Sequence, residues 1–308
     1  MPPAMPADEP VGAGPESSLT PAPPPARPFI KWAGGKGQLI PELARRLPRI
    51  FRRYHEPFVG GGALFFHLYG AGRLRHGAVL SDYNRELIDC YEVIRDDVES
   101  LITALRWHHQ RRLDGEYFRQ IRSWDRQPDF HKRSAIERAA RTIFLNRTCY
   151  NGLYRLNRKG QFNAPFGYYS NPLICDPENL RAVSRALRGV ELRAEDFGAV
   201  LERAEPGDLV YFDPPYVPVS ATASFTHYTA QTFGPEDQRR LAQVVAQLAG
   251  RGVFVMLSNS ATPLSRELYE HDLRLYTSTV LASRKINCDG RKRGSVEELI
   301  VCSYPPGA

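Results

Sequence analysis

Short apolar runs that stop abruptly at acids, glycines or prolines alternate with amphipathic stretches along most of the chain. The apolar runs lie at residues 78–82, 208–212 and 252–260, and two further strand-like segments, in which polar residues stand among the apolar ones, lie at 54–58 and 190–197. Apolar segments of this length, bounded by turn residues, are typical of buried strands. Because these strands alternate with stretches of helical periodicity, the pattern predicts an α/β fold.

Apolar residues three or four positions apart mark the stretches between the strands as helices. We predict helices at residues 39–47, 63–69, 87–94, 135–145 and 238–248. Two more strands are expected at residues 275–281 and 295–304, as an antiparallel pair at the edge of the sheet. The predicted fold is therefore a mixed sheet of about seven strands with helices on both faces.

The alternation of strand and helix is interrupted once, which predicts an inserted domain. From residue 84 to about residue 188 the sequence indicates mainly helices, followed by an irregular stretch. We divide the folded chain into a first core part at 28–97, a mainly helical insertion at 98–188 and a second core part at 189–305. Residues 1–27 are rich in Pro, Ala and Gly and are predicted to form a disordered tail.

Composition and cysteine usage narrow the class of protein. No apolar run of the 308 residues approaches membrane-spanning length, and the N-terminus lacks the apolar core of a signal peptide. We therefore expect a cytoplasmic protein without a membrane partner. The five cysteines are odd in number and contain no C-x-x-C pair, which favours free thiols over disulfides or a zinc site. They are Cys90, Cys149, Cys175, Cys288 and Cys302.

The positive charge of the chain is concentrated in one segment. The net charge is +7, and residues 106–159 alone hold fourteen Lys and Arg against five Asp and Glu. Such an excess is expected of a segment that follows a phosphate backbone. A solvated helix surface is the alternative explanation.

The motif Asp213-Pro214-Pro215-Tyr216 follows the apolar run at 208–212 directly. Proline cannot donate to a sheet ladder, so the strand must end here, at the sheet edge where α/β folds bind ligands. The Asp213 carboxylate and the Pro214 carbonyl offer two acceptors to one group with two hydrogens, which fits an exocyclic amine. Tyr216 offers a flat face for a planar base. A turn without chemistry is the alternative for so short a motif.

Two glycine-rich turns favour a nucleotide-like cofactor. Gly34 and Gly35 precede the predicted helix at 39–47, and three glycines at 60–62 separate a predicted strand from a helix. The next predicted strand ends in Asp82, where an acid can bind ribose hydroxyls. NAD is the rival cofactor, but the G-G-G spacing differs from G-x-G-x-x-G and nothing in the sequence suggests hydride chemistry.

Residues 146–167 interleave Asn, Arg, Tyr and Gly without the period of a helix or a strand. Arginines, amides and aromatic rings are the side chains that read base edges and fill gaps in a duplex. The stretch therefore predicts recognition of nucleic acid, with a surface hairpin as the alternative.

Three stretches together resemble the Dam type of DNA adenine-N6 methyltransferases, of the D12 class. They are the Lys-Trp-Ala-Gly-Gly-Lys segment at 31–36, the stretch at 146–167, and residues 213–216 followed by Ser-Ala-Thr-Ala-x-Phe-Thr at 220–226. The resemblance extends over residues 28–305. It implies a Rossmann-like methyltransferase fold, S-adenosylmethionine as cofactor, and methylation of adenine N6 in duplex DNA, with GATC as the suggested target. It makes the insertion the target-recognition domain, and we expect a monomer.

The resemblance also assigns roles to individual residues. Those implied for S-adenosylmethionine binding are Trp32, Lys36, Phe58, Gly60, Asp82, Asp196, Phe197 and Asp213. Those implied for DNA binding are Lys31, Tyr150, Asn151, Leu153, Arg155 and Pro165, of which Tyr150 and Asn151 would enter the duplex. Those implied for catalysis are Asp213, Pro214 and Tyr216, with no metal ion. At Tyr168 relatives carry an arginine that touches DNA, so this contact differs here.

Several alternatives remain open on the sequence. RNA adenine and DNA cytosine-N4 methylation use similar Asp-Pro-Pro chemistry, and only the stretch at 146–167 argues against them. A DNA-binding regulator on an inactive scaffold is a third alternative, against which the intact cofactor motifs argue. We expect His227 to be a polar loop residue rather than a general base. The basic loop at 284–294 is expected to contact phosphate, with simple solvation as the alternative.

Overall fold

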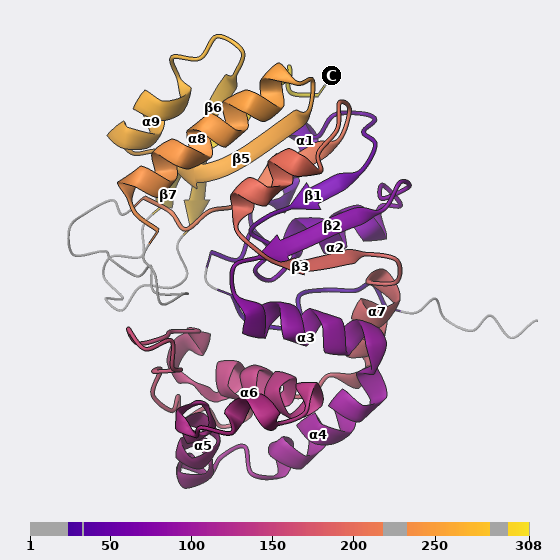
Figure 1. The fold of residues 1–308 in the computed structure, drawn as a ribbon, viewed down its shortest axis with the longest axis vertical. Helices are drawn as coiled ribbons and strands as arrows, with labels where there is room; N and C mark the ends of the chain where they lie inside the picture. The colour runs from indigo at the N-terminus through magenta and orange to yellow at the C-terminus, as the bar shows by residue number, and fades with distance from the viewer. Residues whose placement is uncertain (1–23, 33, 218–232, 284–294, 308) are drawn as a thin grey trace, which may run out of the picture.

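The computed structural model describes residues 24–32, 34–217, 233–283 and 295–307. The strands among them form one sheet in the order β3-β2-β1-β4-β5-β7-β6 (Figure 1). They are β1 (Tyr54–Glu56), β2 (Ala78–Asp82), β3 (Glu191–Ala194), β4 (Leu209–Phe212), β5 (Phe254–Ser260), β6 (Tyr276–Ser283) and β7 (Ser295–Cys302). The predicted sheet of about seven strands is confirmed.

The pairing of the strands identifies the sheet as doubly wound. β1 to β5 pair in parallel, whereas β7 pairs antiparallel with both β5 and β6. The predicted antiparallel pair at the edge is therefore confirmed. The order 3-2-1-4-5 of the parallel strands is that of a Rossmann-like fold, and it reverses between β1 and β4. This reversal is the topological switch point, where such folds bind ligands outside the carboxyl ends of the strands.

Helices fill the predicted stretches, with ends that differ from the prediction by a few residues. They are α1 (Ile40–Arg46), α2 (Ala63–Gly70), α3 (Arg85–Asp96), α4 (Val98–Gln110), α5 (Gly115–Arg122), α6 (Ala135–Thr148), α7 (Pro177–Ala186), α8 (Pro235–Gly250) and α9 (Pro263–Tyr269). Caps explain where several begin. The Asn84 side chain accepts a hydrogen bond from the Leu87 N–H, and Ser134 and Glu137 form a capping box at α6.

Alternate side chains of β4 show that both faces of the sheet are covered. Leu209 and Tyr211 pack into a core shared with α1, α2 and α3. Val210 and Phe212 pack into a second core beneath α8. All four side chains are buried, so β4 reads in the sequence as an unbroken apolar run rather than an alternating one. The prediction of helices on both faces is confirmed.

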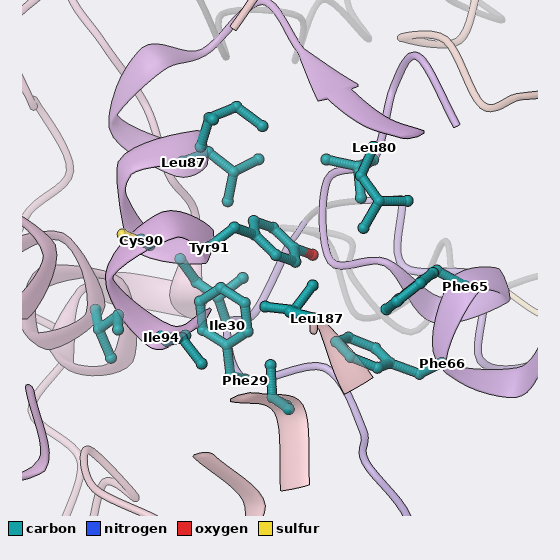
Figure 2. Packing of buried hydrophobic residues seen from close by; sticks show 14 of the residues in the cluster. Phe29, Ile30, Phe65, Phe66, Leu80, Leu87, Cys90, Tyr91, Ile94 and Leu187 are labelled. Atoms are coloured by element: carbon teal, nitrogen blue, oxygen red, sulfur yellow. The ribbon is translucent and has the colours of Figure 1, made fainter. Parts of the chain in front are cut away.

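Figure 2 shows the first of these cores, where α3 meets the N-terminal segment and α2. Tyr91 of α3 packs edge to face on Phe29, with ring centroids 4.9 Å apart. Phe65 and Phe66 of α2 approach from the other side. Burying a side chain of this size stabilises the fold by roughly 1.5–3 kcal/mol. The packing fixes the segment before Trp32 against the sheet.

The helices α4, α5 and α6 gather in a body beside the sheet, with α3 between them and the strands (Figure 1). α6 packs against both α3 and α4. The apolar core of this body is continuous with the first core of the sheet. The boundaries at residues 98 and 188 stay predictions. Arg27, at the end of the predicted tail, is already anchored, since its N–H donates to Asn179 of α7 (3.0 Å).

The third predicted strand is shorter than expected. The sequence predicted extended structure at 190–197, but β3 ends at Ala194 and Phe197 begins the short 3₁₀ helix η4 (Phe197–Glu202). Asp196 ends the extended structure because its carboxylate caps η4, accepting from the Gly198 N–H at 2.9 Å.

Two further observations concern the class of protein. Within the described residues, no helix is long and apolar enough to cross a membrane. Four of the five cysteines are described, and each is a free thiol: Cys90, Cys149, Cys175 and Cys302. Cys288 lies outside the described residues.

A buried ion pair joins the helical body to the core. Arg141 of α6 has no solvent exposure, and its Nη2 lies 2.6 Å from Oδ2 of Asp125. Its Nη1 lies 3.5 Å from Glu86 of α3. The same Asp125 oxygen accepts from the Phe162 N–H at 2.7 Å. The Arg141–Asp125 pair therefore connects α3, α6 and the irregular stretch predicted to read nucleic acid.

Replacing Asp125 with alanine should destabilise the protein by about 3 kcal/mol, because the buried Arg141 guanidinium loses its nearest counter-charge. Urea unfolding followed by circular dichroism measures the change in midpoint. Asp129→Ala is the matched control, since Asp129 is exposed and makes no ion pair within the described residues. Equal midpoints for the two variants would contradict the role given to the buried pair.

Candidate active site

The candidate site lies at the switch point, where Asp213 follows β4 beside the end of β1. Oδ1 of Asp213 is 2.7 Å from the Lys36 ammonium and accepts a hydrogen bond from the Ser258 hydroxyl at 3.2 Å. The Lys36 side chain is 6% exposed and that of Asp213 is 18% exposed. Two residues assigned from the first and the third resembling stretches thus meet as an ion pair shielded from water.

The surroundings of Asp213 act on its pKa in opposite directions. Burial raises the pKa most, the Lys36 ammonium lowers it, and the charge of Glu298 raises it again. The net result is a pKa above the ordinary aspartate value. Ser258, which donates to Asp213, also shares a 2.9 Å hydrogen bond with the Tyr211 hydroxyl. The carboxylate is therefore fixed by groups from β4, β5 and the segment before α1.

The backbone after Asp213 is held by two buried amides that sequence reasoning missed. The Gln238 side chain of α8 donates to the Pro215 carbonyl at 2.9 Å. Asn259 of β5 accepts from the Val217 N–H at 3.3 Å and donates to Gln238 at 2.9 Å. Within the described residues, no donor bonds the Pro214 carbonyl. Isolated amides on a helix and a strand carry no sequence signal, because their partners are decided by tertiary packing.

Tyr216 is held at its far end. Its hydroxyl donates to Glu298 of β7 at 2.6 Å, and the Lys36 ammonium lies 4.4 Å from its ring centroid. The ring therefore stands beside Asp213, and its role in supporting a bound base stays a prediction. Glu298 is a site residue that the sequence analysis did not find.

The glycine turn after β1 is closed by the residues predicted to bind cofactor. Oδ2 of Asp82 accepts from the Gly60 N–H at 3.1 Å, and the Gly60 carbonyl accepts from the Tyr91 hydroxyl at 3.0 Å. Gly60 has φ 47°, and a Cβ there would lie 2.7 Å from Cδ1 of Trp32. Burial raises the pKa of Asp82 to about 6. The structure brings Trp32, Gly60 and Asp82 together at the ends of β1 and β2.

The remaining predicted cofactor residues form an aromatic cluster on the second face of the sheet. Phe58 and Phe197 stack with centroids 5.3 Å apart, and Phe233 meets Phe58 edge on at 5.7 Å. Asp196 is engaged with Arg240, whose Nη2 lies 2.7 Å from Oδ2 and whose guanidinium lies 4.0 Å from the Phe197 centroid. The Arg240 hydrogen bond lowers the pKa of Asp196.

Glu56, the last residue of β1, is a buried acid that was not predicted as a site residue. It is 3% exposed and accepts from the Tyr54 hydroxyl at 2.9 Å. Burial, opposed by the Tyr54 hydrogen bond and reinforced by the charge of Asp213, raises its pKa to about 8. Near neutral pH a protonated Glu56 would therefore add no negative charge to that of Asp213.

The predicted recognition stretch is clamped to the N-terminal segment by Asn146. This fully buried side chain accepts from the Lys31 N–H at 2.9 Å and donates to the carbonyls of Lys31 (2.7 Å) and Gly152 (3.2 Å). Between the clamped positions, Asn151 has φ 56°, in the left-handed region, and Tyr150 is 51% exposed. Lys31, Tyr150 and Asn151 are thus brought together by one amide.

The rest of the stretch forms a short hairpin, closed by an antiparallel bridge between Leu156 and Phe162. Arg155 is exposed on it and donates to the Asn163 carbonyl at 2.8 Å. Leu153 is half-buried and Pro165 is exposed. The surface hairpin considered as an alternative is present, and it carries the residues predicted to read DNA.

Tyr154 connects the hairpin to the cofactor side of the site. Its ring stacks on Trp32 with centroids 5.1 Å apart, and its hydroxyl donates to Glu86 at 3.1 Å. Tyr168, the departure from the resembling family, is 82% exposed with φ 52° and meets Phe166 edge on.

Some predicted residues cannot be placed. His227, the segment at 220–226 and the basic loop at 284–294 lie outside the described residues. Within the part of the chain that is described, no cluster of three or more His, Cys, Asp or Glu could hold a metal ion.

Residues 32–283 match the family model described as D12 class N6 adenine-specific DNA methyltransferase. The chain is 44% identical over 280 residues to the type II methyltransferase M1.LlaDCHI of Lactococcus lactis subsp. cremoris, across 90% of this chain and 95% of that protein. It is 40% identical over 295 residues to the type II methyltransferase M.MjaIII of Methanocaldococcus jannaschii, across 90% and 99%. It is 35% identical over 283 residues to the DNA adenine methylase of Escherichia coli (strain K12), across 91% and 96%.

Replacing Glu56 with glutamine should reduce the loss of stability on raising the pH from about 5 to about 8. The folded protein, with a Glu56 pKa of about 8, holds this proton up to about pH 8, whereas the unfolded chain releases it near the ordinary glutamate pKa of 4.5. Between these values the folded state binds more protons, so stability falls as the pH rises. Urea midpoints at the two pH values measure this fall. Replacing the exposed Glu116 with glutamine is the control. If the urea midpoint of Glu56→Gln fell with pH as much as that of the wild type, the raised pKa given to Glu56 would be contradicted.

Proposed function

Because the chain belongs to the D12 class N6 adenine-specific DNA methyltransferases, we propose that it methylates N6 of an adenine flipped out of duplex DNA, within GATC. The methyl donor is S-adenosylmethionine. The observation that supports this reaction best is the position of Asp213 and Pro214 at the switch point of the sheet. We place the activity in the cytoplasm, on chromosomal DNA, with the monomer as the active form.

The chemistry must overcome the low nucleophilicity of the target amine. An amine on an aromatic ring is a poor nucleophile, because its lone pair is delocalised into the ring. Hydrogen bonds from its two hydrogens to the Asp213 carboxylate and the Pro214 carbonyl draw the nitrogen towards tetrahedral geometry and stabilise its developing positive charge. Positioning by these acceptors and by Tyr216 supplies much of the remaining rate enhancement. The methylated nitrogen is cationic and acidic, so it loses one proton after the transfer without a separate general base, and we assign His227 no part in the step.

The residues around the glycine turn fit a nucleoside-containing donor. The close approach of Gly60 to Trp32 leaves no room for a side chain, and Asp82 and two stacked rings, Phe58 and Phe197, line the ends of the neighbouring strands. S-adenosylmethionine supplies an activated methyl group on a sulfonium. The residues that would hold it are Trp32, Lys36, Phe58, Gly60, Asp82, Asp196, Phe197 and Asp213.

Recognition of DNA is assigned to the hairpin and the turn before it. Tyr150 and Asn151 enter the duplex where the target adenine leaves. Lys31 contacts DNA from beside them. Leu153, Arg155 and Pro165 contact the recognition sequence. This assignment is supported by the exposure of Tyr150, Arg155 and Pro165 next to the clamp at Asn146.

Expression in a host that lacks adenine methylation, followed by mapping of N6-methyladenine at base resolution, tests the proposal. We expect methylation confined to GATC with the wild-type chain, and at least a 100-fold loss with Asp213→Ala and Asp213→Asn. Asp213→Asn is the closer match, because its amide keeps an oxygen for Lys36. Thermal unfolding checks that both variants fold.

Each result of the mapping has a defined meaning. Methyladenine in another sequence would overturn the roles given to Leu153, Arg155 and Pro165 and keep that of Asp213. Activity of more than a few per cent in folded Asp213→Asn would overturn the catalytic assignment. Absence of methyladenine with the wild-type chain would overturn the proposed function.

Replacing Arg155 with alanine should relax specificity at one base pair. A guanidinium that pairs with O6 and N7 of guanine contributes about 1–3 kcal/mol of discrimination. The measurement is the ratio of kcat/KM on a GATC duplex to that on duplexes changed at the guanine. Arg158→Ala, at the exposed turn of the same hairpin, is the control and should lower kcat/KM on both duplexes by the same factor. Equal ratios in the two variants would exclude Arg155 as the guanine reader.

A further inference from the structure

Tyr216 is held both through the backbone around it and through its side-chain hydroxyl. On the backbone side, the Pro215 carbonyl is bonded to Gln238 and the Val217 N–H to Asn259. On the side-chain side, the hydroxyl donates to the Glu298 carboxylate at 2.6 Å. Backbone contacts alone leave a tyrosine free to change its side-chain rotamer. The orientation of the ring therefore depends on its side-chain contacts, of which the Glu298 hydrogen bond is the one that holds the hydroxyl.

Glu298 is placed by the sheet rather than by a loop. In β7 it is paired with Ser260 of β5 on one side and with Val280 of β6 on the other. Side chains along a strand alternate between the two faces, so Glu298 and Ile300 share the face of the first core, whereas Leu299 packs into the second core. The two ladders fix the backbone of Glu298 from both sides, so its side chain leaves the sheet from a rigid position and its carboxylate reaches the Tyr216 hydroxyl.

The neighbouring Glu297 shows that the contact is specific to one position. Glu297 lies on the opposite face of β7, is exposed, and makes only a 3.4 Å ion pair with Arg266 among the described residues. The two glutamates have the same chemistry and adjacent positions, but only Glu298 reaches the site. Tyr216 therefore has two charged neighbours, Glu298 at its hydroxyl and the Lys36 ammonium over its ring.

We propose that Glu298 is a positioning residue of the methyl-transfer reaction, whose carboxylate holds the Tyr216 hydroxyl and so orients the ring that receives the flipped adenine. The inference rests on the proposed function. Glu298 acts through Tyr216 and touches neither the methyl donor nor the target nitrogen. Without the Glu298 carboxylate, the Tyr216 ring stays in the site but changes its orientation more freely. The flipped base is then bound in several orientations, and few of them are reactive.

A double-mutant cycle with the full-length chain tests the proposal. Tyr216→Phe keeps the ring and removes the hydroxyl, and Glu298→Ala removes the acceptor. Each should lower kcat for a GATC duplex about ten-fold, as expected for one charge-assisted hydrogen bond. The double variant should be no worse than either single one, because both changes break the same bond. Glu298→Gln should recover much of the rate, since its amide oxygen can accept the hydroxyl proton.

A fluorescent readout separates positioning from folding. With 2-aminopurine in place of the target adenine, Glu298→Ala should alter the fluorescence of the flipped base, and Glu297→Ala should match the wild type in fluorescence and kcat. Unchanged unfolding of Glu298→Gln shows that the strand pairing survives. Multiplicative losses in the double variant, or equal behaviour of Glu298→Ala and Glu297→Ala, would overturn the proposal while methylation by the wild type persists. No methylation by the wild type overturns the proposed function together with this inference.

Discussion

The Lys36–Asp213 ion pair is the interaction on which the geometry of the site depends. A buried carboxylate without a partner would cost several kcal/mol, so Asp213 can stand at the end of β4 only because Lys36 reaches it. Lys36 in turn is held in place by donating to the Gly34 carbonyl at 2.7 Å. The segment before α1 and the end of the central strand are therefore joined by charge, and both carry residues of the proposed site.

The same segment is tied at its other end to the recognition stretch. Asn146 bonds the backbone of Lys31 on both sides, and Tyr154 stacks on Trp32 one residue further on. A short run of residues thus connects the hairpin proposed to read DNA to the carboxylate proposed to bind the target amine. The connection is continuous, because packed rings and buried hydrogen bonds make every step of it.

The sequence predicted what depends on local pattern. The buried strands, the antiparallel edge pair and the helices carry their own periodicity, and the prolines after Asp213 mark a strand end without reference to anything distant. The sequence could not supply contacts that arise when distant strands pair. Glu298 looks like any strand glutamate until β7 lies beside β5, and Gln238 and Asn259 are ordinary amides until α8 covers the sheet. The excess of positive charge in the basic segment also overstated the charge available to bind phosphate, because Arg141 is buried and paired with Asp125.

The contacts of Asp213 show how one carboxylate can serve both the fold and the reaction. Lys36 and Ser258 both approach Oδ1. Within the described residues no hydrogen bond is made to Oδ2, and none to the Pro214 carbonyl. The oxygen that stabilises the fold is therefore not the one proposed to bind the substrate, and the two acceptors that remain match the two hydrogens of the proposed target amine.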